Sequence, residues 1–314
     1  MINNSTDNHQ PSISVVVPVY NGSETLALLT ERLNAILPTI AQQYEIIFVN
    51  DGSLDDSWEC ITELCSRFQY VRGINLLRNF GQHNAILCGI RTAKNEIIIT
   101  MDDDLQHPPD QIPLLLKKLQ QGYDVVYGIP RKMPHSFFRN LASWLIKRIL
   151  ALVMGIKTIK DISAFRAFRS RLVTVFQDYR SPGVIIDVML SWGTTRFSTV
   201  VVEEEPREIG KSNYTFRKLL KQAFLILTGF STIPLRFASF LGFSFTIFGF
   251  GVFVYVLIVY FTQGSIPGFP FLASIISLFS GIQLWMLGIL GEYLARIFDR
   301  SMDRPPYFIG EMIN

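Results

Sequence analysis

Charged residues and cysteines are both scarce in this sequence of 314 residues. Charged residues make up 18%, less than the roughly one quarter usual in a soluble domain, and the formal net charge is only +3. So small a positive charge excludes a protein that binds nucleic acid by bulk attraction, and we expect no nucleic-acid partner. The three cysteines, Cys60, Cys65 and Cys88, lack metal-ligand spacing and cannot all pair, which predicts free thiols in a reducing compartment.

Two common nucleotide-binding motifs and a signal peptide are also missing. Neither G-x-G-x-x-G nor G-x-x-x-x-G-K-[ST] occurs, which removes the main support for a dinucleotide site or a P-loop. The opening residues, MINNSTDNHQPS, contain no apolar run. We therefore expect a flexible tail over residues 1–12 and no signal peptide.

Apolar residues, in contrast, are in excess at 49%, with 25 phenylalanines. The runs Phe237–Phe261 and Phe269–Leu290 are each long enough to cross a bilayer, and only TQGSIPG joins them. A buried helical pair in a soluble protein is the alternative, but it would need much more surrounding chain. Basic residues flank the pair on both sides and are absent from the turn: Arg217, Lys218, Lys221, Arg236, Arg296, Arg300 and Arg304. The positive-inside rule thus predicts two transmembrane helices over residues 235–294 of an inner (plasma) membrane, with a cytoplasmic tail over 295–314 and both termini in the cytoplasm.

The part before these runs alternates between strand-like and helix-like segments. Short apolar runs predict strands at Ile13–Val19, Tyr44–Asn50, Val71–Leu77, Glu96–Asp102 and Asp124–Gly128. Longer segments between them predict helices at Glu24–Leu37, Asp55–Phe68, Gln82–Thr92 and Pro109–Gln120. This order indicates an α/β fold with a mostly parallel sheet covered by helices on both faces. Ligands of such sheets bind beyond the carboxyl ends of the strands.

Three of these strand ends are polar: PVYNG (18–22), VNDGSLDD (49–56) and TMDDDLQ (100–106). Three adjacent aspartates repel one another unless a cation neutralises them, and oxygen ligands suit Mg²⁺ or Mn²⁺. In an extended chain Asp102, Asp104 and Gln106 would face one side, with Asp103 pointing away. We therefore expect Asp102, Asp104 and Gln106 to hold the metal, with a solvated acidic turn as the alternative.

Basic residues are concentrated between residues 131 and 180, where the sequence itself offers only Asp161 and Asp178 as opposing charges. They are Arg131, Lys132, Arg139, Lys147, Arg148, Lys157, Lys160, Arg166, Arg169, Arg171 and Arg180. Within this stretch the segment near 136–154 has one apolar side, which predicts an amphipathic helix in the membrane interface. A solvated basic face and packing against a partner helix are the alternatives. We expect a second interfacial helix over 213–234.

At this point the sequence resembles a known family. PVYNG, VNDGSLDDS, LLRNFGQHNAI, MDDDLQHPPDQIP and GYDVVYG, in this order, resemble family-two glycosyltransferases with a GT-A fold. REIGKSNYTFRKL, LGILGEYLARIF and DRPPYFI narrow the resemblance to polyprenyl-phosphate glycosyltransferases, such as relatives of dolichol-phosphate mannose synthase and bacterial undecaprenyl-phosphate glucosyltransferases. The resemblance implies a GT-A catalytic domain over 13–212, a nucleotide-sugar donor (a UDP-sugar, with glucose favoured), Mg²⁺ or Mn²⁺, a polyprenyl-phosphate acceptor and a homo-tetramer.

The resemblance also implies roles for individual residues. Asp51 would recognise the base. Nucleotide-binding residues would be Pro18, Tyr20, Asn21, Asp51, Arg78, Asn79, Gly81, Asp102 and Asp103. Arg131, Arg207, Lys211 and Ser212 would bind the lipid phosphate or the diphosphate, and Asp104, Asp161 and Arg131 would be catalytic.

Two positions depart from the family pattern. Many relatives carry an acidic residue where this chain has Gly22, so a pocket carboxylate would be missing. Relatives also carry an aspartate just before Phe-Arg, where this chain has Ala164, and we assign the acceptor-side role to Asp161 instead. A phosphate monoester is largely dianionic at neutral pH, so a strong general base is not required. For His83 and His107 we expect solvated or hydrogen-bonded side chains and no catalytic role.

Two other functions fit parts of the sequence. A processive polysaccharide synthase would use the same nucleotide pocket, but this sequence has neither a longer membrane channel nor a Q-x-x-R-W motif. A membrane scaffold or sugar-nucleotide sensor could keep the fold without turnover, which the departures at Gly22 and Ala164 would permit. The aspartate cluster argues against it, because a sensor has little need of a metal-diphosphate site.

Overall fold

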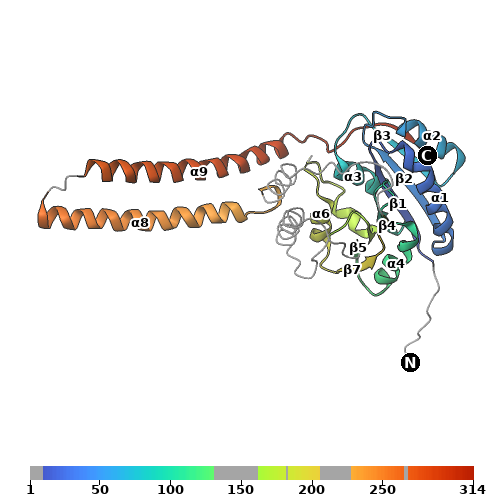
Figure 1. Cartoon of the computed structure of the whole chain (residues 1–314), viewed down its shortest axis with the longest axis horizontal. Helices are drawn as coiled ribbons and strands as arrows, with labels where there is room; N and C mark the ends of the chain where they lie inside the picture. Colours follow the sequence, from blue (N-terminus) through green and yellow to red (C-terminus); the bar gives the residue numbers. More distant parts are fainter. Residues whose placement is uncertain (1–9, 131–161, 182, 206–227, 265–267) are drawn as a thin grey trace, which may run out of the picture. The chain divides into compact units, whose positions relative to one another are not determined.

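The computed structural model describes residues 10–130, 162–181, 183–205, 228–264 and 268–314. The chain forms two compact units (Figure 1). One comprises Met1–Leu220 together with Asp303–Asn314, and the other comprises Lys221–Met302. The final residues of the chain therefore belong to the first unit, although the second unit separates them from it in the sequence.

A mixed sheet is the centre of the first unit. In the described residues it has eight strands in the order β7-β5-β6-β4-β1-β2-β3-β8. Strands β1–β4 pair in parallel, as do β5 and β7, whereas β6 and β8 pair antiparallel to their neighbours. The strands are β1 Ser12–Val19, β2 Gln43–Asn50, β3 Val71–Leu76, β4 Ile97–Thr100, β5 Val125–Pro130, β6 Arg166–Arg169, β7 Phe197–Val202 and β8 Ile309–Ile313.

Helices cover both faces of this sheet, as the continuous apolar runs predict. Leucines of α1 and α4 pack with Val15 and Val17 of β1 in one large core. On the opposite face α3 lies against Val16 and Val49. The helices of this unit are α1 Ser23–Ile40, α2 Ser57–Arg67, α3 Gln82–Thr92, η1 Pro109–Gln111, α4 Ile112–Gln120, η2 Ser170–Val175 and α6 Ile186–Gly193.

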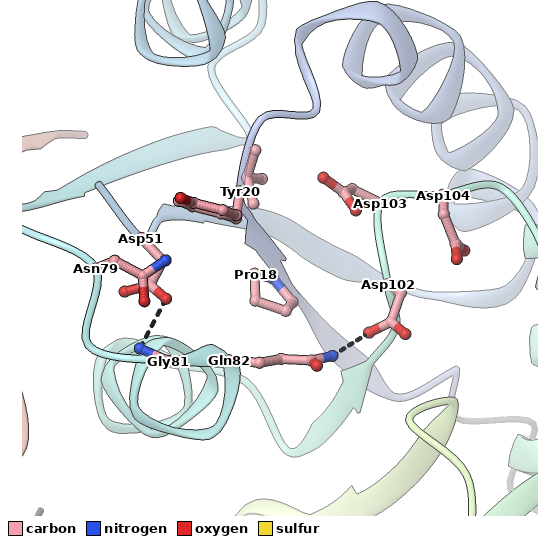
Figure 2. A pocket seen from close by; sticks show the side chains of 10 residues that line it. Pro18, Tyr20, Asp51, Asn79, Gly81, Gln82, Asp102, Asp103 and Asp104 are labelled. Carbon is pink, nitrogen blue, oxygen red and sulfur yellow. Dashed lines mark hydrogen bonds between the residues drawn. The ribbon is translucent and has the colours of Figure 1, made fainter. Parts of the chain in front are cut away.

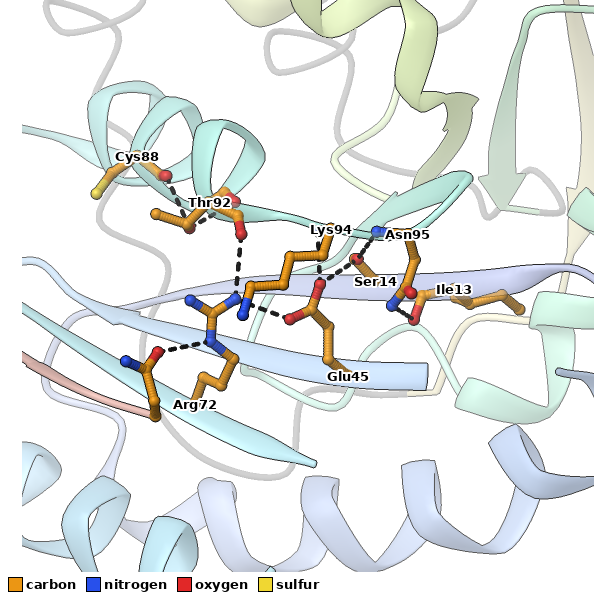
Figure 3. Close-up of polar contacts among 10 residues, drawn as sticks. Ile13, Ser14, Glu45, Arg72, Cys88, Thr92, Lys94 and Asn95 are labelled. Atoms are coloured by element: carbon orange, nitrogen blue, oxygen red, sulfur yellow. Dashed lines mark hydrogen bonds and ion pairs between the residues drawn. The ribbon is translucent and has the colours of Figure 1, made fainter. Parts of the chain in front are cut away.

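A buried polar cluster ties the first three strands together (Figure 3). The carboxylate of Glu45 accepts hydrogen bonds from Ser14 Oγ at 2.6 Å, Lys94 N at 2.7 Å and Arg72 Nη1 at 2.8 Å. Arg72 also donates from Nε to Oδ1 of Asn314, the last residue. The Glu45–Arg72 ion pair is buried and both side chains are hydrogen-bonded to groups on other elements. These hydrogen bonds fix the register of β1, β2 and β3 and attach Asn314 to β3.

The four described arginines at the end of the basic stretch all pair with carboxylates from other parts of the chain. Arg166 is 1% exposed and pairs with Asp187, which the sequence reading did not count as an opposing charge. The other opposing carboxylates also come from distant segments: Arg169 pairs with Glu96 and Asp124, Arg171 with Asp124, and Arg180 with Asp303. Counting charges within a short stretch of sequence therefore underestimates how many of its basic residues are paired in the folded sheet.

The second unit contains two long helices, α8 Ile233–Gln263 and α9 Phe269–Ser301, which run side by side (Figure 1). Two segments, Ile233–Thr262 and Leu278–Ser301, are long and apolar enough to cross a membrane. Aromatic contacts join the helices, including Phe245 against Phe279 with ring centroids 5.8 Å apart. Many large apolar side chains of the described parts of these helices are exposed, among them Phe240, Phe253 and Leu284, which differs from the buried helical pair of a soluble protein.

Several expected boundaries differ from the structure. Helix α9 continues to Ser301, past the expected end of the second transmembrane helix at 294, and residues 309–313 of the expected cytoplasmic tail form β8. The interfacial segment near 136–154 and most of 213–234 lie outside the described residues, as do residues 1–9 of the expected tail, and these remain predictions. All three cysteines are free thiols, as expected, and burial raises the pKa of Cys88 to about 12.

Candidate active site

A pocket of about 300 Å³ lies at the carboxyl ends of β1, β2 and β4 and at the start of α3 (Figure 2). In Figure 2 the Asp51 wall and the Asp102–Asp104 wall face each other, with Pro18 between them and Tyr20 above. The lining residues are Pro18, Val19, Tyr20, Asp51, Asn79, Gly81, Gln82, Asp102, Asp103 and Asp104. A site at the carboxyl edge of a largely parallel sheet is where such folds bind ligands.

Asp51, at the end of β2, has its carboxylate held by the loop that follows β3. It accepts hydrogen bonds from the backbone N–H of Phe80 at 2.7 Å and of Gly81 at 2.9 Å. Burial raises the pKa of Asp51, and these two hydrogen bonds act in the opposite direction. Gly52 permits the close approach of the two turns, since it has φ +66° and a Cβ there would lie 2.5 Å from the backbone of Arg78.

The three aspartates do not continue the extended alternation of β4. The strand ends at Thr100, and the chain bends at 103–105, where Leu105 adopts φ 60° and is buried. The bend turns Leu105 into the core, and Asp103 lines the pocket together with Asp102 and Asp104. The expectation that Asp103 points away is therefore wrong, because it assumed an extended chain where the burial of Leu105 requires a turn.

Two neighbours hold the outer aspartates. Gln82 donates from Nε2 to Asp102 Oδ1 at 2.6 Å (Figure 2), and the N–H of Gln106 donates to Asp104 Oδ1 at 3.2 Å. Gln106, an expected metal ligand, is not among the residues that line the pocket. Its role in the structure is to hold Asp104 in place through its main chain.

The donor set fits a metal that shares its ligands with a substrate. Within the described residues no three His, Cys, Asp or Glu side chains are arranged to hold a metal ion by themselves. The pocket nevertheless gathers three carboxylates on one wall. Mg²⁺ commonly takes one or two carboxylates together with the phosphates of a substrate, and Mn²⁺ also prefers oxygen ligands. The acidic wall therefore suits a divalent metal that binds together with a diphosphate.

Gly22 leaves room for one of these carboxylates. A Cβ at Gly22 would overlap the Oδ2 atom of Asp103. The pocket therefore has a carboxylate next to position 22, although the residue at that position carries none. It comes from Asp103 on the opposite segment.

The structure brings together most of the residues expected to bind a nucleotide, but not Asn21 or Arg78. Asn21 has φ 53° and accepts a hydrogen bond from Leu54 N at 2.9 Å, so it joins two loops. The guanidinium of Arg78 lies over the ring of Phe80. Asp161, Arg131, Arg207, Lys211 and Ser212 lie outside the described residues, and their roles remain predictions.

The sequence reading missed Val19 and Gln82 in the pocket. Gln82 is the first residue of α3, at a helix N-terminus where backbone N–H groups lack intrahelical partners. The sequence does contain a signal for Gln82: it is the first residue of the predicted helix 82–92 and follows Gly81 of the expected nucleotide loop directly.

Each of the two histidines near the motifs is partly exposed but has one ring nitrogen that is neither solvated nor hydrogen-bonded to a described residue. Nδ1 of His83 and Nδ1 of His107 are buried without a hydrogen-bond partner among the described residues. Burial lowers the pKa of His83 to about 4, and nearby Asp187 acts in the opposite direction. At neutral pH the ring of His83 is therefore uncharged.

A buried ion pair lies behind β4. Arg166 donates from Nε to Thr100 Oγ1 at 2.9 Å and pairs with Asp187, which also accepts from Tyr127 Oη at 2.9 Å. Thr100 in turn donates to the carbonyl of Ala164 at 2.8 Å. Ala164, the residue before Phe165, thus contributes a main-chain acceptor to this network.

Fold and pocket together define the class of protein. The structure resembles glucosyl-3-phosphoglycerate synthase from Mycobacterium tuberculosis, solved with Mn²⁺, UDP and phosphoglyceric acid. The TM-score is 0.51 at 16% identity, over 69% of this chain and 76% of that one. The fold is that of the GT-A glycosyltransferases.

The sequence gives the family. Residues 14–176 match the description "Glycosyl transferase family 2", and this chain belongs to that family and is a glycosyltransferase. It is 35% identical, over 306 residues, to the undecaprenyl-phosphate 4-deoxy-4-formamido-L-arabinose transferase of Klebsiella pneumoniae subsp. pneumoniae. The match covers 96% of this chain and 93% of the relative. The protein of the same description from Klebsiella pneumoniae strain 342 is 34% identical over the same shares.

Proposed function

We propose that the protein is a membrane-bound, inverting glycosyltransferase that moves a sugar from a nucleotide sugar to a polyprenyl phosphate. The observation that carries the proposal is the match over 96% of the chain to relatives named for transfer to undecaprenyl phosphate. That match continues past the catalytic domain through both apolar helices. The proposed location is the inner membrane, with the catalytic unit in the cytoplasm.

The pocket supports a nucleotide diphosphate as part of the donor. Tyr20 is 49% exposed and offers an aromatic face on which a base can stack, next to the Asp51 wall. The opposite wall, Asp102–Asp104, is suited to a metal and the diphosphate. A bound Mg²⁺ or Mn²⁺, held by Asp102 and Asp104, would stabilise negative charge on the leaving diphosphate. The structural neighbour solved with Mn²⁺ and UDP supports the choice of a divalent metal and of a UDP-sugar.

The attack by the lipid phosphate requires that the phosphate be positioned correctly, and it does not require a strong general base. The second pKa of a phosphate monoester is about 6, so the lipid phosphate is largely a dianion at neutral pH. One phosphate oxygen attacks the anomeric carbon, the bond from that carbon to the diphosphate oxygen breaks, and the nucleoside diphosphate leaves with the bonding electrons. Attack opposite the leaving group inverts the anomeric centre. Asp161, Arg131, Arg207, Lys211 and Ser212 are the residues we assign to the acceptor phosphate and diphosphate.

Two donor sugars are candidates, and an experiment distinguishes between them. The family resemblance favours UDP-glucose, whereas the named relatives point to a nucleotide-linked 4-deoxy-4-formamido-L-arabinose. The purified full chain is incubated with undecaprenyl phosphate, Mg²⁺ or Mn²⁺, and a panel of UDP- and GDP-sugars that includes both. We expect one donor to yield a sugar-phosphoryl lipid and EDTA to abolish the product. Binding of donors without turnover on any lipid phosphate would instead favour the scaffold or sensor.

A further inference from the structure

We propose that the chain end after the two apolar helices positions the nucleotide loop. Phe308 and β8 hold the loop Arg78–Gly81, and that loop holds Asp51. The inference rests on the proposed function only in taking a nucleoside diphosphate as the ligand of the pocket. It assigns a positioning role to a segment more than 200 residues from the loop in sequence, and no motif of the catalytic domain includes that segment.

The first step is the junction between β8 and the loop. Strand β8 pairs antiparallel with β3, and the chain enters the loop directly after β3. The pairing shifts register between Asn75 and Leu76, where the sheet gives way to the loop. Beyond the shift, the N–H of Leu77 donates to the carbonyl of Phe308 at 3.0 Å. The residue that precedes Arg78 is therefore fixed by the chain end.

The second step is the side chain of Phe80. Its ring lies with its centroid 6.4 Å from that of Phe308, within the range of aromatic pairs. The guanidinium of Arg78 lies 4.7 Å from the centroid of the Phe80 ring, the geometry of a cation–π contact. Phe308 thus contacts the side chain around which the loop is organised.

The third step leads from Phe80 to the pocket. The N–H groups of Phe80 and Gly81 are the two backbone donors to the Asp51 carboxylate, and the carbonyl of Phe80 accepts from Asn84 Nδ2 at 2.7 Å. Asn79 and Gly81, on either side of Phe80, line the pocket. A shift of Phe80 would therefore move two donors to Asp51 and two lining residues together.

The chain end is itself firmly attached. Tyr307 accepts a hydrogen bond from Arg91 Nη1 of α3 at 3.4 Å, and Glu311 accepts one from Trp58 Nε1 of α2 at 3.2 Å. The contact of Arg72 with Asn314 adds an anchor on β3. Because α2, α3 and β3 all hold this segment, it can transmit a fixed position to Phe80 instead of following the loop.

The test is nucleotide affinity in the purified full chain. We expect Phe308→Ala to weaken the binding of UDP with Mn²⁺, measured by isothermal titration calorimetry, about tenfold. Phe308→Tyr keeps the ring and should bind UDP as the wild type does. Met312→Ala is the matched control, because it removes a large apolar side chain of β8 at a residue that pairs with Ile74, away from the loop. It should leave the affinity unchanged.

A second readout separates positioning from a general loss of structure. The KM for the donor should rise in Phe308→Ala while the KM for the lipid phosphate stays the same, and Phe308→Leu should bind UDP with an intermediate affinity. Wild-type affinity in Phe308→Ala would overturn the inference, as would an equal loss in Met312→Ala. If wild-type protein binds neither UDP nor GDP with either metal, the proposed function itself fails, which the wild-type titration alone reveals.

Discussion

The carboxylate of Asp103 lies in the space into which a side chain at Gly22 would project. The two residues come from different loops, one after β1 and the other after β4, and their proximity is possible only because residue 22 is a glycine. An acidic side chain at position 22 and the observed Asp103 conformation exclude each other. The aspartate cluster and the glycine are therefore one feature of the pocket.

Gly22→Ala should displace the Asp103 carboxylate and raise the KM for the donor. We expect roughly a tenfold loss of kcat/KM, since a small displacement of a group that binds the reacting part of a substrate is costly. Steady-state kinetics with the donor that the panel of UDP- and GDP-sugars selects measures this loss. Gly183→Ala is the control, because a Cβ there meets nothing within 4 Å. Unchanged kinetics in Gly22→Ala would show that Asp103 does not contact the donor.

Asp104→Ala should reduce metal-dependent turnover by about a hundredfold or more while the protein stays folded. The reason is that Asp104 belongs to the carboxylate wall that we assign to the metal and the diphosphate. Product formation over a Mn²⁺ titration, together with a circular dichroism spectrum, checks both parts. Asp110→Ala, an exposed residue of η1, should behave as the wild type. Retained metal-dependent turnover in Asp104→Ala would refute the metal assignment.

Arg166→Met should lower the free energy of unfolding by about 3–5 kcal/mol, because it leaves the buried carboxylate of Asp187 without its cation. Thermal unfolding of the full chain in detergent measures this as a fall in Tm. Glu63→Ala removes an exposed pair with Arg67 at 3.7 Å, which contributes less than about 1 kcal/mol. A similar fall in Tm for both variants would mean that burial does not set the strength of the Arg166–Asp187 pair.

His83 should make the protein less stable in mild acid. Its pKa in the folded state is about 4, compared with 6.5 for an ordinary histidine. Between these pH values the unfolded chain binds the proton and the folded chain does not. Stability is thus complete above pH 6.5 and falls as the pH drops toward 4, by up to about 3 kcal/mol.

The measurement is Tm at pH 7.5 and at pH 5 for wild type and His83→Leu. The variant should lose less on acidification, since it lacks the group that takes up the proton. Among the described residues, Asp187 and Arg166 are the charged groups that act on His83, and both are present in the two proteins. An identical loss in the variant would assign the acid sensitivity to other groups.

The strands and helices that the sequence predicts correctly are those whose pattern of residues is visible within a short segment. The five predicted strands and four predicted helices of the catalytic unit are all present, with ends shifted by a few residues. Their β-branched runs and helical spacing are readable without knowing what they pack against. In the pocket, Asp51 and Asp102–Asp104 were found in the same way, because each lies in a polar segment directly after a predicted strand.

The missed elements depend on distant partners. Strand β6 contains only Arg-Ala-Phe-Arg, and its first arginine is buried where Asp187 of α6 and Thr100 of β4 act as its partners. Strand β8 contains glycine and glutamate, which disfavour strands, and pairs with β3 across more than 200 residues. The bend that aims Asp103 into the pocket follows from the burial of Leu105, which only the assembled core imposes.

The strand order also sets the order in which the protein can be completed during synthesis. Strand β8 occupies residues 309–313 of 314, so the ribosome makes both long apolar helices before it makes the last strand of the sheet. Until then, the edge of β3 and the loop at Phe80 lack their partner. A nascent chain can therefore assemble most of the catalytic unit early, but the nucleotide loop gains the support of Phe308 and β8 only after both long apolar helices have been synthesised.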